Sequence, residues 1–106
     1  MERKHRSKME VFTFDFITPP STEGMNLLKG KLNEVADKVI LALGDNFYDL
    51  DIKFWEMSSG NQVDPYDGSM AISAFQSADQ MAKDILKLAP VALEWKKKRE
   101  EEYPSK

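Results

Sequence analysis

The sequence predicts an α+β protein, a two-layer sandwich in the order β-α-β-β-α, with a three-stranded mixed sheet and two helices on one face. Three observations lead to this prediction. Apolar residues alternate in three short segments, as they do in half-buried strands. In two longer segments they recur every three or four positions, as in amphipathic helices. The chain has 106 residues, 42% of them hydrophobic, which suits one domain with a modest core.

The first strand is predicted at residues 10–17, where phenylalanines alternate with other residues. Two prolines follow and end it, because proline cannot continue a sheet ladder. A helix is expected from an N-cap at Ser21 or Thr22 to Gly44, which suits the left-handed position after a helix. The apolar stripe of this helix consists of Met25, Leu28, Leu32, Val35, Val39 and Leu43.

The second strand is predicted at residues 48–57 and the third at residues 69–75, with a loop at 58–68 between them. The inward face of the second strand would carry Tyr48, Leu50, Ile52 and Phe54. The outward face would carry Phe47, Asp49, Asp51, Lys53, Trp55 and Met57. Trp55 then either contacts a partner or lies beneath the 58–68 loop as a satellite of the core.

The second helix is predicted to begin with a capping box, with Ser77 as N-cap and Gln80 three residues later. Its apolar stripe places Trp95 in the core, and Pro90 predicts a kink or a break into two helices. A helix joins the first two strands, so they are expected to be parallel; the second and third are expected to form an antiparallel pair. The order matches a ferredoxin-like βαββαβ unit without its last strand, and we recognise no protein family in the sequence.

The predicted domain spans residues 10–103, between a flexible basic arm at residues 1–9 and a tail at 104–106. Residues 9–95 contain fourteen acidic and six basic residues, and this balance of −8 disfavours nucleic acid as a partner. Only weak contact with nucleic acid is expected from the bases of the arm: Arg3, Lys4, Arg6 and Lys8. No apolar run reaches the roughly 18 residues of a membrane span, and no hydrophobic segment follows the basic arm. We therefore expect a soluble cytoplasmic protein.

The sequence lacks the residues and motifs that most kinds of enzymatic catalysis require. There is no cysteine, which excludes disulfides, metal thiolates and a cysteine nucleophile. The sequence contains no phosphate-binding loop, nucleophile elbow or zinc-protease motif, and the single histidine, His5, lies in the arm. We expect no catalytic residue, no metal site and no cofactor.

Two groups of carboxylates nevertheless need an interpretation. Asp49 and Asp51 would share one strand face about 7 Å apart, a spacing that suits acid–base catalysis or a cation but also an ordinary solvated strand. The segment from Asp64 to Gly68, DPYDG, resembles part of a calcium loop. Its spacing does not match one, whereas the turn preferences of Asp, Pro and Gly explain it directly.

The outward face of the sheet is too apolar for plain solvent, since it would carry Val11, Thr13, Ile17, Phe47, Trp55, Met57, Ala71 and Phe75. We therefore expect a small non-catalytic protein–protein interaction domain that forms a homodimer and docks a basic partner surface. The residues expected to form the interaction surface are Phe47, Asp49, Asp51, Trp55, Met57, Asp64, Tyr66 and Asp67.

Two alternative functions stay open. An acidic protein of this size can imitate the phosphate row of a nucleic acid and act as an inhibitor of a DNA- or RNA-binding protein, with a viral or mobile-element origin. A carboxylate-based enzyme or ligand-binding domain would instead use Asp49, Asp51 and Tyr66 in a cleft beside the long loop.

Overall fold

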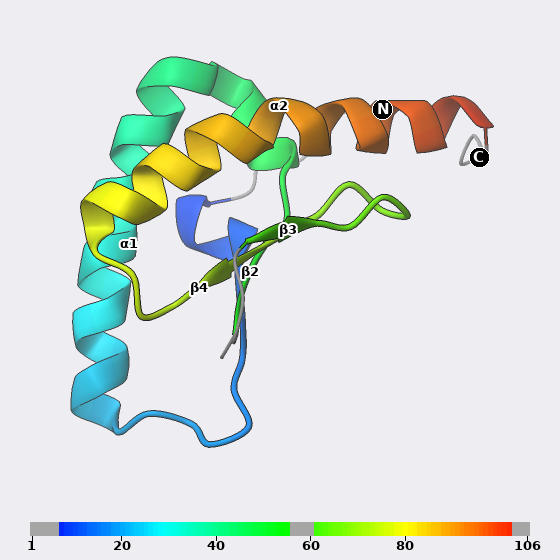
Figure 1. Ribbon diagram of the computed structural model, residues 1–106. Helices are drawn as coiled ribbons and strands as arrows, with labels where there is room; N and C mark the ends of the chain where they lie inside the picture. The colour runs from blue at the N-terminus through cyan, green and yellow to red at the C-terminus, as the bar shows by residue number, and fades with distance from the viewer. Residues whose placement is uncertain (1–6, 56–60, 103–106) are drawn as a thin grey trace.

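Two helices lie against one face of a four-stranded mixed sheet, the α+β two-layer class that the sequence predicts (Figure 1). The computed structural model describes residues 7–55 and 61–102. The strands are β1 (Phe12–Asp15), β2 (Ile52–Trp55), β3 (Gln62–Val63) and β4 (Met70–Ser73). The helices are α1 (Thr22–Leu43) and α2 (Ala78–Glu102), with short 3-10 helices η1 (Lys8–Val11) and η2 (Gly44–Asp49) before β1 and β2.

The strand order is β1-β2-β4-β3, which corrects two expectations. The sheet has four strands instead of three, because the connection from β2 to β4 contains the short strand β3. Strands β1 and β2 are parallel as predicted, but β2 and β4 are parallel too, and only β3 runs antiparallel to β4. The connection at residues 56–69 exceeds the dozen or so residues that a parallel crossover requires. The order of α-helices and strands is therefore β-α-β-β-β-α, which differs from the expected ferredoxin-like order by the additional strand β3.

Both helices begin, and α1 also ends, where their capping residues predict. Ser21 caps α1 by accepting a hydrogen bond from the Gly24 N–H at 3.1 Å, and Gly44 ends it with φ of 63°. Ser77 accepts the Gln80 N–H at 3.2 Å at the start of α2. Of the two outcomes expected at Pro90, a kink or a break, the break is wrong, since α2 runs as one helix through that residue. Among the described residues, neither helix combines the length and apolarity that crossing a membrane requires.

The strands are shorter than the alternation of apolar residues predicts. Val11 belongs to η1 and Phe47 to η2, and both side chains are fully buried. A tight helical turn aims successive side chains differently from a strand, so alternation cannot be extended through it. The predicted outward positions of these two residues are therefore wrong.

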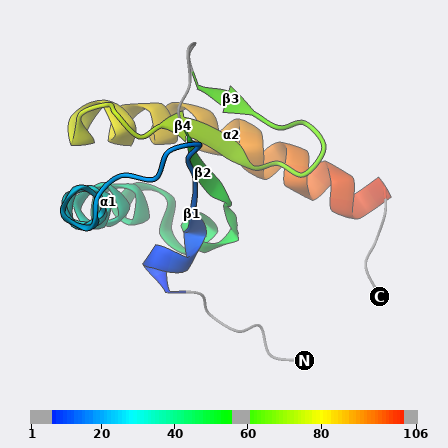
Figure 2. The same cartoon turned by 90° about the horizontal axis from the view of Figure 1, so that it is seen from below.

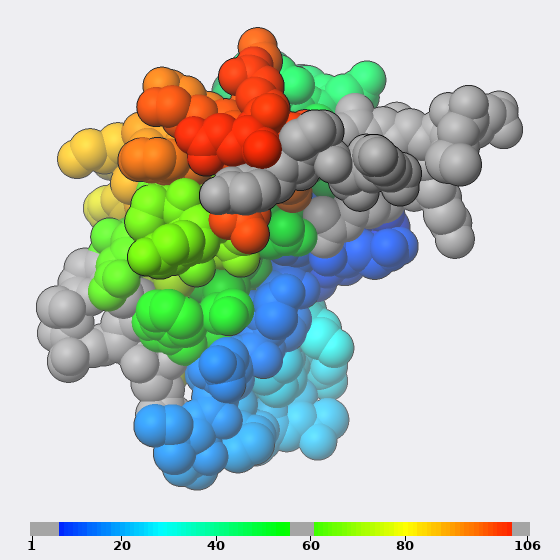
Figure 3. Space-filling view, turned by 90° about the vertical axis from the view of Figure 1, so that its right-hand side faces the viewer, coloured from blue at the N-terminus to red at the C-terminus, as the bar shows by residue number. Residues whose placement is uncertain are grey.

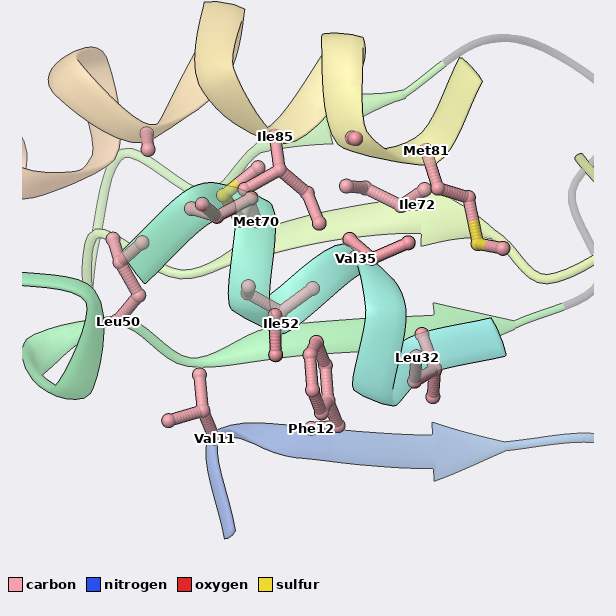
Figure 4. Close-up of a cluster of buried hydrophobic side chains, with 14 of the residues drawn as sticks. Val11, Phe12, Leu32, Val35, Leu50, Ile52, Met70, Ile72, Met81 and Ile85 are labelled. Carbon is pink, nitrogen blue, oxygen red and sulfur yellow. The ribbon is translucent and has the colours of Figure 1, made fainter. Parts of the chain in front are cut away.

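The core lies between the helices and one face of the sheet (Figure 4). Its sheet side is made of Phe12, Ile52, Phe54, Met70 and Ile72. Its helix side is made of Leu28, Leu32, Val35, Ala36 and Val39 from α1 and Met81, Ala82, Ile85, Ala89 and Ala92 from α2. The C-terminal part of α2 runs on past the strands (Figure 2).

Candidate interaction surface

The face of the sheet turned away from the helices is the first candidate site. Side chains alternate along a strand, so the residues between the core positions point to this open face. The register aligns Thr13, Lys53, Ala71 and Gln62 in one row across the four strands, and Asp15, Trp55 and Ser73 in the next. Thr13 and Asp15 are exposed, whereas Lys53 and Trp55 are half-buried. The prediction that Lys53 and Trp55 lie on the outward face is confirmed.

Lys53 and Trp55 interact with each other on this open face. The Lys53 ammonium lies 5.7 Å from the centre of the Trp55 ring, within the range of a cation–π contact. The two side chains leave the same strand two positions apart, so strand geometry alone brings them together. The contact keeps a large amphipathic ring on the surface of the sheet.

The loop between β3 and β4 is built by turn chemistry. The Asp64 carboxylate accepts the Tyr66 N–H at 2.8 Å, and the Asp67 carboxylate accepts the Ser69 N–H at 2.9 Å. The Asp64 and Ser69 main chains also pair, with 2.8 Å between the Asp64 nitrogen and the Ser69 oxygen. These bonds fix a tight loop whose tip is Tyr66, and they agree with the turn interpretation of DPYDG.

Gly68 fastens this loop to α2. Its φ is 74°, and a side-chain carbon placed there would lie 2.5 Å from the Ala92 carbonyl oxygen and 2.7 Å from the Lys96 backbone nitrogen. Only glycine satisfies both the left-handed backbone and this close approach. The sequence marks Gly68 as a turn residue but gives no sign of the helix against which it packs.

Trp55, Asp64 and Tyr66, three of the predicted site residues, line one depression of about 340 Å³, which we call the sheet-face hollow. Lys53, Gln62, Val63, Pro65, Ser69 and Ala71 complete it. Ala71 is nearly inaccessible although it lies on the open face, so it sits at the bottom of the hollow. Tyr66 is 75% exposed and forms a raised wall.

Asp49 and Asp51 lie apart from the sheet-face hollow. Asp49 ends η2 and Asp51 precedes β2, so they are not the same-face strand pair that the alternation predicts. The Lys96 ammonium, from α2, donates to the Asp49 carbonyl and lies 3.2 Å from the Asp51 carboxylate. Lys96, which the sequence places in the charged end of the second helix, thus connects α2 to the start of β2.

Asp67 sits between this ion pair and the hollow. A side-chain hydrogen bond with Ser69 is the main cause that holds the pKa of Asp67 below its usual value, and the charges of Lys53 and Lys96 lower it further. The described residues contain no group of three His, Asp or Glu side chains arranged to hold a metal ion. The open face presents the aromatic rings of Trp55 and Tyr66 together with the charges of Lys53 and Asp64.

The remaining predicted site residues have different fates. Phe47 is in the core and cannot contact a partner. Met57 lies outside the described residues. Trp95, which the α2 stripe assigns to the core, is 37% exposed because α2 continues beyond the sheet. The run of charged residues directly after Trp95 is the signal in the sequence that could have shown this.

A second depression of about 430 Å³ lies beside Trp95 and is called the helix hollow. Its lining residues are Pro65, Tyr66, Trp95, Lys98, Arg99 and Glu102. A separate depression of about 290 Å³ opens at the carboxyl ends of β1 and β4, where Phe16, Pro20, Leu27 and Phe75 form its apolar lining. We call this third depression the edge hollow.

Comparisons of the chain with protein-family models, with curated proteins and with solved structures find no match.

Proposed function

We propose that the protein is a small non-catalytic interaction domain that binds a partner protein through the open face of its sheet. One observation carries the proposal: Trp55 and Tyr66 wall the sheet-face hollow on a face that neither helix covers. Amphipathic aromatic side chains at a concave surface are the residues that most often dominate binding energy. The cytoplasmic location expected from the sequence belongs to the same proposal, and fractionation of cells that express the tagged chain checks it.

Charge favours a partner with basic residues on the sheet side of this surface. Asp15 lies on the open face, and Asp64 and Asp67 lie in the loop beside it, against the single base Lys53 of β2. Asp49 and Asp51 lie beside Lys96, away from this surface. Exposed charges of this kind affect the association rate and the orientation of a partner more than its affinity.

Selection of a random peptide display library on the immobilised protein tests the proposal. Peptides enriched on the parent protein are expected to bind Trp55→Ala and Tyr66→Ala at least tenfold more weakly, a loss of about 1.4 kcal/mol or more. Phe75→Ala is the matched control, because Phe75 is as exposed as Tyr66 but lines the edge hollow. Enriched peptides that bind all three variants equally would overturn the proposal.

The proposal also includes a homodimer, formed through a different surface from the open face of the sheet. Val11 and Phe47, which were expected on the open face, are buried in the core. In contrast, Ile17, Leu27 and Phe75 at the carboxyl edge of the sheet are 91%, 66% and 73% exposed. Leu27 and Phe75 both line the edge hollow, and a second copy burying this patch would remove their apolar surface from water. Light scattering is expected to show a dimer that Phe75→Asp converts to a monomer, and a parent protein that is always monomeric removes this part of the proposal.

A further inference from the structure

Shared lining residues connect the sheet-face hollow to two depressions along α2. The helix hollow shares Pro65 and Tyr66 with it, and a further depression of about 190 Å³ around Val91 and Glu94 shares Trp95 and Lys98 with the helix hollow. Figure 3 views this side of the molecule, where the lime-green atoms of the loop lie between the green atoms of β2 and the orange-red atoms of α2. The depressions thus form a chain that spans two layers of the fold.

Three aromatic side chains line these depressions, and we call them the aromatic row: Trp55, Tyr66 and Trp95. Tyr66 stands between the first two depressions as a ridge, because it lines both and is largely exposed. The side chains of the strands alone do not form this ridge. The ridge exists because Gly68 allows the loop to pack against Ala92 and Lys96 of α2.

Each tryptophan of the aromatic row has a cation over its ring. Lys53 lies 5.7 Å from the Trp55 ring centre, and Lys98 lies 5.6 Å from the Trp95 ring centre. The indole N–H groups and the Tyr66 hydroxyl are hydrogen-bond donors on otherwise apolar bodies. The row therefore combines apolar contact with donors that suit peptide carbonyl groups.

We propose that the aromatic row binds a proline-rich segment of a partner protein in the polyproline II conformation; this rests on the proposed function of the open face. A polyproline II chain has three residues per turn and no internal hydrogen bonds, so its side chains project at intervals and its carbonyls stay available. Successive depressions between aromatic ridges match projecting prolines, and the donors of the row match the carbonyls.

Charge complementarity favours a basic residue at one end of the ligand. At the α2 end Lys98 and Arg99 are balanced by Glu94 and Glu102, whereas at the loop side Asp64 and Asp67 outnumber Lys53. The favoured ligand is therefore a proline-rich segment with a basic residue beside Asp64. This refines the basic partner expected from the sequence.

Two other modes of peptide recognition fit the surface less well. A helix needs one continuous apolar groove, whereas Tyr66 interrupts this one. Addition of a strand needs a free sheet edge, and β3 at this side provides only Gln62 and Val63. A segment added to β1 at the opposite edge would not touch the aromatic row, so its binding would not respond to changes there.

Calorimetric titration with synthetic peptides tests the inference. The probe is a peptide of consecutive prolines with arginine at one end, and the control peptide keeps the arginine and replaces the prolines by alternating glycine and alanine. The parent protein is expected to bind the proline peptide at least tenfold more tightly than the control.

Variants of the protein test the same surface. Tyr66→Ala and Trp95→Ala are each expected to weaken binding of the proline peptide tenfold, and Phe75→Ala is expected to leave this binding unchanged.

Equal affinity for the two peptides, or proline binding that survives Tyr66→Ala, would overturn the inference. Unfolding in urea checks that each variant stays folded, and Tyr66 is suited to this because little of its side chain is buried. The display selection separates this failure from that of the proposed function. Selected peptides that depend on Trp55 and Tyr66 but contain no proline run contradict the inference alone, whereas peptides independent of both residues contradict both.

Discussion

Gly68 is the residue on which the geometry of the candidate surface depends most. Alanine at this position would meet the Ala92 carbonyl oxygen at 2.5 Å and would have to hold φ near 74°. We expect Gly68→Ala to lower the free energy of unfolding by about 1–3 kcal/mol, since both overpacking and backbone strain oppose the change. Urea denaturation measures it.

Gly30 provides the matched control for this prediction. It lies within α1, and a side-chain carbon there would meet nothing within 4 Å. Gly30→Ala is expected to raise the free energy of unfolding by roughly 0.5–1 kcal/mol, because glycine costs conformational entropy in a helix. If Gly68→Ala were as stable as the parent, the packing of the loop on α2 would be wrong.

Asp67 makes stability depend on pH in a defined direction. Its pKa is lowered in the folded protein from an ordinary value of 3.8, so the ionised form is favoured by folding. This contribution is complete above the unfolded pKa and is lost as the pH falls through the folded pKa. Asp67→Asn is therefore expected to be less stable than the parent at pH 7, by less than about 1 kcal/mol at this exposed site.

The difference between the parent and Asp67→Asn should begin to close as the pH falls below the ordinary value of 3.8, and it should vanish below the lowered pKa of the folded protein, where the parent carboxylate is protonated as well. Asparagine keeps an oxygen that can accept the Ser69 N–H, so the comparison isolates the charge. Free energies of unfolding measured across this range decide the matter. A constant difference at every pH would show that the charge of Asp67 contributes nothing.

Among the elements, α2 contains the clearest departure from local preference. Pro90 is exposed in the helix interior, where it removes one hydrogen bond and crowds the carbonyl of Leu86. Pro90→Ala is expected to raise the free energy of unfolding, by up to about 3 kcal/mol. Lys87→Ala, one turn earlier on the exposed side, is the control and should change stability by less than about 0.5 kcal/mol. A thermal melt in which Pro90→Ala unfolds earlier than the parent would contradict the account.

The elements also show where prediction from this sequence succeeds and where it stops. Helix limits were predictable because caps such as Ser21 and Gly44 act through their own neighbours. The 3-10 helix η2 was missed because Phe47 continues the alternation of the strand that follows it. The parallel pairing of β2 with β4 depends on contacts far apart in the chain, which no local pattern records.

At the scale of the whole molecule, the candidate surface was only partly predictable. Trp55 could be assigned to the open face because strand alternation determines it, and Tyr66 because loop tips are exposed. Trp55 and Tyr66 lie on one surface with Trp95 because the loop packs on α2 at Gly68. The residues concerned are distant in sequence, so only the three-dimensional structure brings them into one row.

Mapping of amide chemical shifts by NMR, as a display-selected peptide is added, tests the central claim most directly. The account predicts that the shifted amides cluster around Lys53, Trp55, Tyr66 and Ala71 on the open face of the sheet. Shifts confined to the edge hollow around Leu27 and Phe75, with the open face unchanged, would contradict it.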